Sequence, residues 1–199
     1  VRDYTALTFS LTREFDGDWG ASLSYTNSES VGNYEGTVKS DNGQDDAGLT
    51  TLFDQPGLLD GAYGDLPNDR RHQVKLYGAY AVTDDLTLGA NFQFWTGRPI
   101  NAFGYHPTDI FAQDYDSESF YAGGELAPRG SRGRTSSYYS VDLSASYNID
   151  IGEDQTLVVR ADIFNVLNND RVTEVNEIYD DESSADPTNP DVNPNYGLP

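Results

Sequence analysis

Alternation between apolar and polar residues is the feature that most constrains how this chain can fold. In one stretch, Val74, Leu76 and Tyr80 share one parity of position, whereas Gln73 and Lys75 have the other. Successive side chains of an extended strand point to opposite sides, so the pattern predicts β-strands with one apolar face and one polar face. The fold therefore depends on what covers the apolar face.

The same alternation recurs along the chain and predicts an all-β, antiparallel fold. We expect strands near residues 5–15, 19–27, 72–82, 86–96, 138–149 and 156–167. Short connections at 16–18, 83–85 and 150–155 join these strands into three hairpins. The first connection contains Asp16-Gly17, a pair that favours tight hairpin turns.

The connections outside the hairpins are much longer. They cover about residues 28–70 and 97–136, and residues 168–199 follow the last strand. Irregular loops of this length are uncommon in compact domains. Short turns on one side and long loops on the other are the layout of an outer-membrane β-barrel, with the turns periplasmic and the loops extracellular.

Aromatic residues gather near both ends of the predicted apolar faces. One group, near the short turns, is Phe15, Trp19, Tyr80 and Tyr147, and the other, near the long loops, is Tyr25, Phe94 and Tyr139. Two such rows match the aromatic girdles of a transmembrane barrel. A soluble β-sandwich has similar alternation but no reason to sort its rings to the strand ends. We therefore predict that the apolar face meets lipid.

Composition limits the other possibilities. The 199 residues include no Cys, no Met, 12 Lys+Arg and 33 Asp+Glu, for a net charge of −21. Such a negative net charge disfavours binding to nucleic acid, because its phosphates are also negative. The absence of Cys disfavours a disulfide scaffold and thiolate metal sites. No apolar run approaches the roughly 18 residues of a membrane-spanning helix.

The expected strands are too few for a complete barrel. Membrane-spanning barrels begin at about eight strands, and an open edge in lipid leaves backbone groups unpaired. The first residue is Val rather than Met, which also favours a piece of a longer protein. We therefore expect the remaining barrel strands to lie outside these residues.

Four ordered motifs resemble a known family. They read LPNDRRHQ at 66–73, TGRPIN at 96–101, RGSRGRT at 129–135 and ADIFNVLNN at 161–169. Together they resemble the C-terminal β-barrel of TonB-dependent outer-membrane receptors of Gram-negative bacteria. Within that family they are most similar to the Oar-like group, which has an N-terminal carboxypeptidase-regulatory-like domain.

The resemblance implies a barrel of about 22 strands around a plug domain. It implies that this chain forms part of the wall of a transporter that binds a ligand through its extracellular loops and imports it. The implied partners are the remaining strands, the plug, the TonB energy-coupling complex, lipopolysaccharide and outer-membrane lipid, and a surface lipoprotein or another outer-membrane protein. Two alternatives remain: a passive barrel whose acidic surface loops bind a partner or matrix, and a secreted soluble β-sandwich binding module.

Arginines gather where the predicted loops meet the strands. These candidates for a ligand-binding rim are Arg70, Arg71, Arg98, Arg129, Arg132 and Arg134. Guanidinium groups suit carboxylates and phosphates, so the rim could bind an anionic substrate or lipopolysaccharide. Because the loops hold an excess of carboxylates, pairing within the chain is the preferred interpretation.

Two acidic clusters are weak candidates for structural calcium. The residues are Asp41, Asp45 and Asp46 in one loop, and Asp180, Asp181 and Glu182 in another. Calcium prefers several oxygen ligands, but neither cluster has the spacing of an EF-hand. Solvated acidic loops are the preferred interpretation, so we expect no metal site and no other cofactor.

A few charged residues fall on the polar face of the predicted strands. Lys75, Asp142, Arg160 and Asp162 would face the barrel lumen. They could line a permeation path, but pairing with the plug or with each other is preferred. Nothing in the sequence places a base beside a nucleophile, so we expect no catalytic residue and no enzymatic activity.

Overall fold

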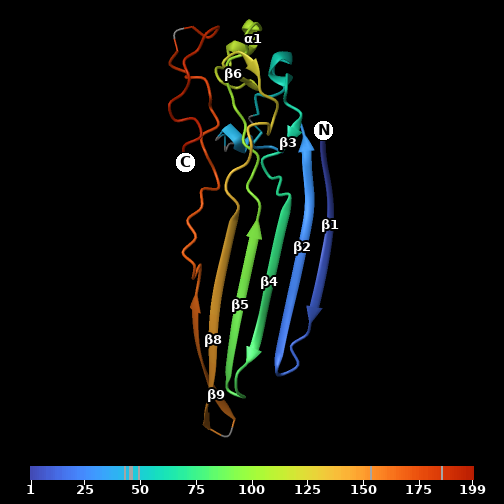
Figure 1. The fold of residues 1–199 in the computed structure, drawn as a ribbon, viewed down its shortest axis with the longest axis vertical. Coiled ribbons are helices and arrows are strands. Elements are labelled where there is room, and N and C mark those ends of the chain that lie inside the picture. Colours follow the sequence, from blue (N-terminus) through green and yellow to red (C-terminus); the bar gives the residue numbers. More distant parts are fainter. Residues whose placement is uncertain (43, 45–46, 49, 153, 185) are drawn as a thin grey trace.

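The long strands form one antiparallel sheet in which sequence neighbours are also neighbours in space. The computed structural model describes residues 1–42, 44, 47–48, 50–152, 154–184 and 186–199. The strands are β1 (Arg2–Arg13), β2 (Trp19–Gly32), β4 (His72–Ala81), β5 (Leu86–Trp95), β8 (Tyr138–Gly152) and β9 (Gln155–Ile163), in the order β1-β2-β4-β5-β8-β9 (Figure 1). This arrangement confirms the predicted all-β antiparallel fold.

Shorter elements lie in the long connections. They are η1 (Ser40–Asn42), η2 (Pro56–Leu59), β3 (Gly64–Asp65), α1 (Ile110–Gln113), β6 (Tyr121–Ala122) and β7 (Glu125–Leu126). Strand β3 extends the pairing of β2, and β6 pairs with β7 in a separate two-stranded sheet. Among the described residues, no helix is long and apolar enough to cross a membrane.

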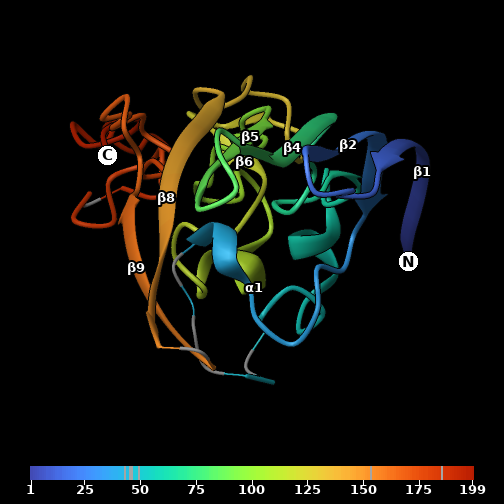
Figure 2. The ribbon, with the colours of Figure 1, turned by 90° about the horizontal axis from the view of Figure 1, so that it is seen from below.

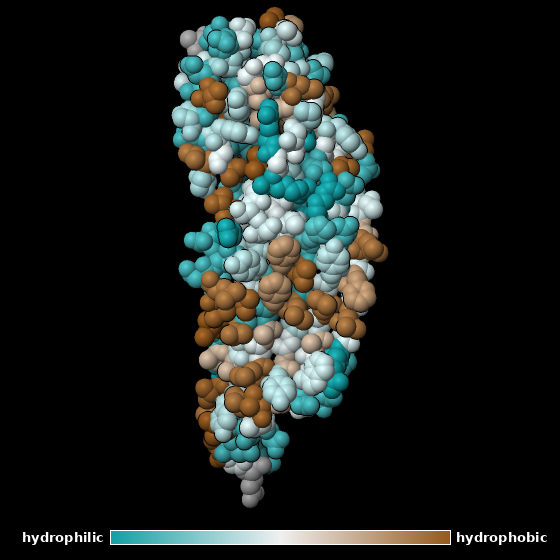
Figure 3. Space-filling view, in the orientation of Figure 1, coloured by the Kyte–Doolittle hydropathy of each residue, from teal (hydrophilic) through white to brown (hydrophobic). Residues whose placement is uncertain are grey.

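Strand register lines up the apolar residues in rows across the sheet. One row contains Leu11, Leu23, Leu76, Phe92 and Val141, paired from strand to strand. The next apolar row toward the long connections contains Phe9, Tyr25, Val74, Phe94 and Tyr139. These rows remain open to solvent; Leu11 is 62% exposed and Leu76 is 41% exposed. Figure 3 shows hydrophobic side chains gathered over the strands and hydrophilic ones over the upper end of the molecule.

The sheet is curved and open. Seen from below in Figure 2, the strands follow an arc from β9 to β1. Among the strands that the structure describes, β1 and β9 have no neighbour on their outer sides. The polar positions face the concave side of the arc.

The long connections fold together at one end of the sheet. We call the described residues of 33–71, 96–137 and 164–199 the head. The head lies above the strands and leans over the concave side, opposite the short turns (Figures 1 and 2). It covers polar positions at the top of β2, where Ser28 and Ser30 are buried. Its own apolar core is formed by Leu52, Ala62, Phe103 and Phe120.

The turn between β1 and β2 differs from the sequence prediction. Phe15 was expected on the apolar face, but it lines a hollow on the polar face. Strand β1 ends at Arg13, and the Asp16 carboxylate then accepts hydrogen bonds from the N–H groups of Asp18 and Trp19. This tight turn folds the chain across the concave side, so the alternation of β1 does not extend to Phe15.

The absence of a side chain at Gly20 makes room for that turn. A Cβ atom at this position would lie 2.7 Å from the backbone nitrogen and Cα of Phe15. In the complete protein, Gly20→Ala should therefore destabilise the sheet by about 1–3 kcal/mol, the usual range for overpacking. Urea titration of the folded protein measures the change.

Gly152→Ala is the matched control for Gly20→Ala. Gly152 also lies in a long strand, and its nearest neighbour would be 3.9 Å from the new Cβ atom. Its effect should stay within about 0.5 kcal/mol, as for most surface substitutions. Equal effects of the two substitutions would show that close packing at Gly20 is not important.

Candidate functional site

Buried ion pairs connect the three segments of the head. Arg98, in the second connection, donates a hydrogen bond to Glu177, in the third. The backbone N–H and side-chain amide of Asn101 donate to the other oxygen of Glu177, at 2.9 and 2.7 Å. The Glu177 side chain is fully buried. Burial raises its pKa, and the Arg98 guanidinium opposes that shift.

A second buried pair connects the first and second segments. The Nη1 atom of Arg129 lies 2.8 Å from Oδ2 of Asp41, and both side chains are fully buried. Arg129 also donates through Nε to the carbonyl of Ala62, at 2.7 Å. The Asn101 amide donates to the same Asp41 oxygen at 3.0 Å, so the two ion pairs share one amide. The guanidinium of Arg129 stacks over Phe120 of the apolar core.

Two further arginines form ion pairs where the head meets the sheet. Arg71 and Arg134 both contact Asp65 and Asp69, and the Asp69 side chain is fully buried. Asp69 also accepts a hydrogen bond of 2.6 Å from the backbone N–H of Ser30 in β2. This cluster therefore joins the first and second connections to the top of a long strand.

The remaining predicted rim arginines, Arg70 and Arg132, form none of these ion pairs. Arg70 donates to the backbone carbonyls of Pro67 and Asp69. Arg132 is exposed on the surface. The structure thus directs most of the rim guanidinium groups to partners within the chain. Ligand binding by these arginines stays a prediction.

Lys39 makes a buried contact that the sequence did not indicate. Its Nζ atom lies 2.5 Å from Oε2 of Glu118 and 4.5 Å from the centre of the Phe103 ring. Only 2% of the lysine side chain is exposed. Lys39 and Glu177 belong to none of the sequence motifs, so no sequence signal pointed to them. Asn101 is the last residue of TGRPIN, and that motif could have identified it as a candidate site residue.

The acidic calcium candidates are separated in the structure. Asp41 pairs with Arg129, while Asp180 accepts hydrogen bonds from the backbone N–H groups of Tyr105 and Gly123. Asp181 accepts hydrogen bonds from Ser183 in an exposed turn, and Glu182 is also exposed. Asp45 and Asp46 lie outside the described residues. Within the described ranges, no group of three or more His, Cys, Asp or Glu residues is arranged to hold a metal ion.

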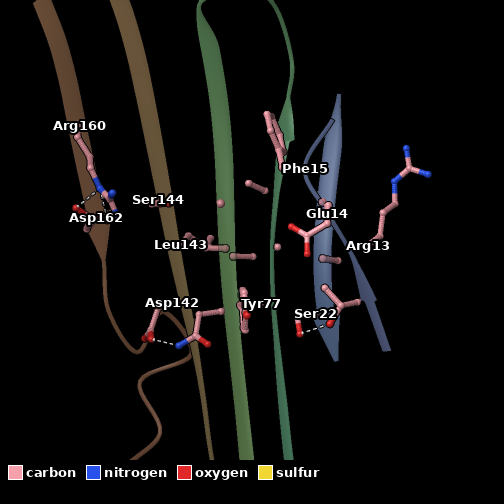
Figure 4. Close-up of a pocket in the computed structure, with 18 of the residues that line it drawn as sticks. Arg13, Glu14, Phe15, Ser22, Tyr77, Asp142, Leu143, Ser144, Arg160 and Asp162 are labelled. Atoms are coloured by element: carbon pink, nitrogen blue, oxygen red, sulfur yellow. Dashed lines mark hydrogen bonds and ion pairs between the residues drawn. The ribbon is translucent and has the colours of Figure 1, made fainter. Parts of the chain in front are cut away.

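A hollow of mixed polarity lies on the concave side, near the short turns. It has a volume of about 550 Å³. Its polar lining residues include Thr12, Ser22, Tyr77, Asn91, Asp142, Ser144, Arg160 and Asp162, and its apolar ones include Phe15, Ala21, Leu143 and Phe164. In Figure 4, Glu14 points toward the hollow and Arg13 points away from it. The hollow therefore combines hydroxyl, amide, carboxylate and guanidinium groups with apolar side chains.

The charged residues predicted for the polar face have different surroundings. Arg160 and Asp162 pair with each other at 2.8 Å in β9 (Figure 4). Asp142 accepts hydrogen bonds from Asn91 and from the backbone N–H of Asn165, at 2.9 and 2.8 Å. Lys75 is exposed on β4, outside the hollow. Asp142 therefore holds the end of β9 in place as well as lining the hollow.

Sequence comparison supports a relationship to the TonB-dependent receptors. The chain is 34% identical over 183 residues to the "TonB-dependent transporter Oar" of Myxococcus xanthus. The match covers 90% of this chain but only 16% of the length of that relative. No family model matches the chain, and no solved structure matches it.

Proposed function

We propose that this chain forms consecutive strands in the wall of a TonB-dependent outer-membrane transporter. The head is then extracellular and contacts a ligand, the short turns are periplasmic, and the concave face lines the lumen. The remaining strands, a plug domain and the TonB complex complete the working protein. The chain itself binds and guides the ligand without changing it chemically.

The apolar rows in register across the sheet are the observation that carries this proposal. Within the described residues no second sheet packs on these rows, and leucines such as Leu11 and Leu143 remain exposed. A soluble sandwich would bury one face of each sheet. A lipid-facing wall leaves that face uncovered by protein and places polar side chains inside.

Open edges at β1 and β9 support a larger closed sheet. An unpaired strand edge in hydrocarbon leaves backbone groups without hydrogen bonds, at several kcal/mol each. Further strands on both sides would satisfy these groups. The relative is named a TonB-dependent transporter, which favours active import over passive anchoring of the head.

Single cysteines test the proposed sidedness, because the chain has no native cysteine. We expect Ser131→Cys, on the exposed surface of the head, to react with a membrane-impermeant maleimide on intact cells. Asp84→Cys, in an exposed short turn, should react only after the outer membrane is opened. The opposite pattern would place the head in the periplasm and contradict extracellular recognition.

A second measurement separates active import from passive anchoring. Candidate ligands are compounds that cells with the complete protein remove from the growth medium and cells without it do not. A strain without TonB then tests whether this uptake requires energy coupling. A transporter loses uptake in both deletion strains. If the protein is a passive anchor, all strains remove the same compounds from the medium, and its surface contacts persist in the strain without TonB.

A further inference from the structure

Two carboxyl groups lie close together inside the head, and each has one buried oxygen that accepts no hydrogen bond. These are Oε1 of Glu35 and Oδ1 of Asp41, which have no hydrogen-bond donor among the described residues. Their side chains are 10% and 0% exposed. The other oxygen of Glu35 accepts a hydrogen bond from Ser40. Nη1 of Arg129 lies 3.6 Å from Oε1 of Glu35 and 2.8 Å from Oδ2 of Asp41, so the two carboxyl groups are neighbours around one guanidinium. Two ionised carboxylates cannot hydrogen-bond to each other, whereas one shared proton satisfies both oxygens.

We propose that Glu35 and Asp41 share a proton and so form a pH-dependent latch that holds the first long connection in the head. The latch is closed in acid and weakens as the pH rises toward neutrality. It adds a regulatory property to the head that the transporter proposal does not require. Its test also does not depend on transport.

The position of the pair explains why its opening would affect the whole first connection. Asp41 contacts Arg129 and Asn101 from the second connection. Later in the same connection, Leu52 is buried in the core with Phe103 and Phe120. Repulsion between Glu35 and Asp41 therefore acts at the place where the first connection contacts the rest of the head.

The other charged groups around the pair do not remove this repulsion. Arg129 lies 3.6 Å from Glu35 and 2.8 Å from Asp41, so a single guanidinium serves two carboxylates. Arg2 of β1 reaches only the backbone carbonyl of Glu35. Glu177 is a further negative charge close to Asp41, but it is paired with Arg98. Glu118 is paired with Lys39.

The direction of the pH effect follows from the raised pKa of Glu35. Burial and the nearby Asp41 carboxylate raise this pKa from 4.5 to about 7. The closed head thus keeps a proton that an open, hydrated Glu35 would release near pH 4.5. The closed state is favoured most below that value and loses this contribution as the pH rises to about 7.

Cysteine accessibility measures the latch in the complete, membrane-embedded protein. Leu52→Cys places a thiol in the head core, where the native side chain is 3% exposed. Ser137→Cys provides an exposed reference thiol that corrects for the change of thiol ionisation with pH. We expect the labelling rate at position 52, divided by that at 137, to rise about tenfold or more from pH 5 to pH 8. A flat ratio would overturn the proposal.

Glu35→Gln tests which carboxyl group is responsible. The amide carries its hydrogens at every pH, so this variant should keep the slow, acid-like ratio at pH 8. Glu125→Gln, at an exposed position in β7, should leave the parent pH profile unchanged. A Glu35→Gln profile as steep as that of the parent would overturn the proposal.

Two further outcomes keep the proposal falsifiable. If Glu35→Gln fails to fold, the midpoint of the parent profile still decides, because a midpoint outside the range of about 4.5 to 7 contradicts the shared proton. Calcium added at pH 8 provides the other test. Restoration of slow labelling by calcium would mean that the pair binds a cation instead of a proton. Failure of sidedness labelling, by contrast, would overturn the transporter proposal and leave the pH profile intact.

Discussion

Leu143→Arg should destabilise the complete protein by about 2–4 kcal/mol, because in the proposed barrel an arginine near the middle of the lipid-facing surface loses its hydration. Leu143 lies in β8, in a row with Ala90 of β5 and Ile163 of β9. It is flanked on its own strand by the apolar Val141 and Ala145. Equilibrium unfolding of the complete protein in bilayers measures the loss.

Ser144→Arg is the matched control, one residue further along the same strand. Ser144 has the opposite parity to Leu143 and is paired in register with Asp162. An arginine there meets water and carboxylates, so the effect should be about 0–1 kcal/mol. Equal losses at the two positions would contradict the assignment of faces and, with it, the membrane proposal.

Arg129→Ala should open the head, at a cost of about 3–5 kcal/mol, the range for removing one partner of a buried ion pair. The substitution leaves the fully buried Asp41 carboxylate without its guanidinium and removes the hydrogen bond to the Ala62 carbonyl. Hydrogen exchange of amides inside the head, such as that of Phe103, which donates to the Glu177 carbonyl, measures the opening free energy. The strands should keep their protection, because the ion pair does not contact the lower sheet.

Arg132→Ala distinguishes loss of the buried pair from a general loss of positive charge. Arg132 lies in the same segment of the head and is exposed. Its replacement should change exchange by about 0.5 kcal/mol or less. If the head amides were equally protected from exchange in Arg129→Ala and Arg132→Ala, the buried pair would not be holding the head together.

Strand position and face were predictable because both depend on local alternation. Leu76 and Phe92, on different strands, were placed on one face by parity alone, and the register brings them side by side. Phe15 shows the limit of this method. Its parity matches that of β1, but the strand ends at Arg13, and the following turn reverses the side on which the ring lies.

The head was not predictable, because its core is assembled from segments far apart in the sequence. Leu52, Phe103 and Phe120 each lie in irregular chain with no periodic pattern around them. Solvated loops were therefore the natural interpretation of so many carboxylates. The arginine motifs contained part of the site, since Arg98 and Arg129 form its buried pairs, but sequence alone gives no partner at such separations.

The connectivity of the sheet and the head imposes an order on folding. Each long strand pairs with its neighbour in the sequence, so the hairpins can form one after another with short loop closures. The head instead requires Asp41 to meet Arg129 across the β4–β5 hairpin, and Arg98 to meet Glu177 across the β8–β9 hairpin. The first pair can form before β8, whereas the second can close only after β9 has brought the last segment back to the top of the sheet. A chain halted before β9 would thus have most of its sheet but an unfinished head, and Arg98 would remain without Glu177.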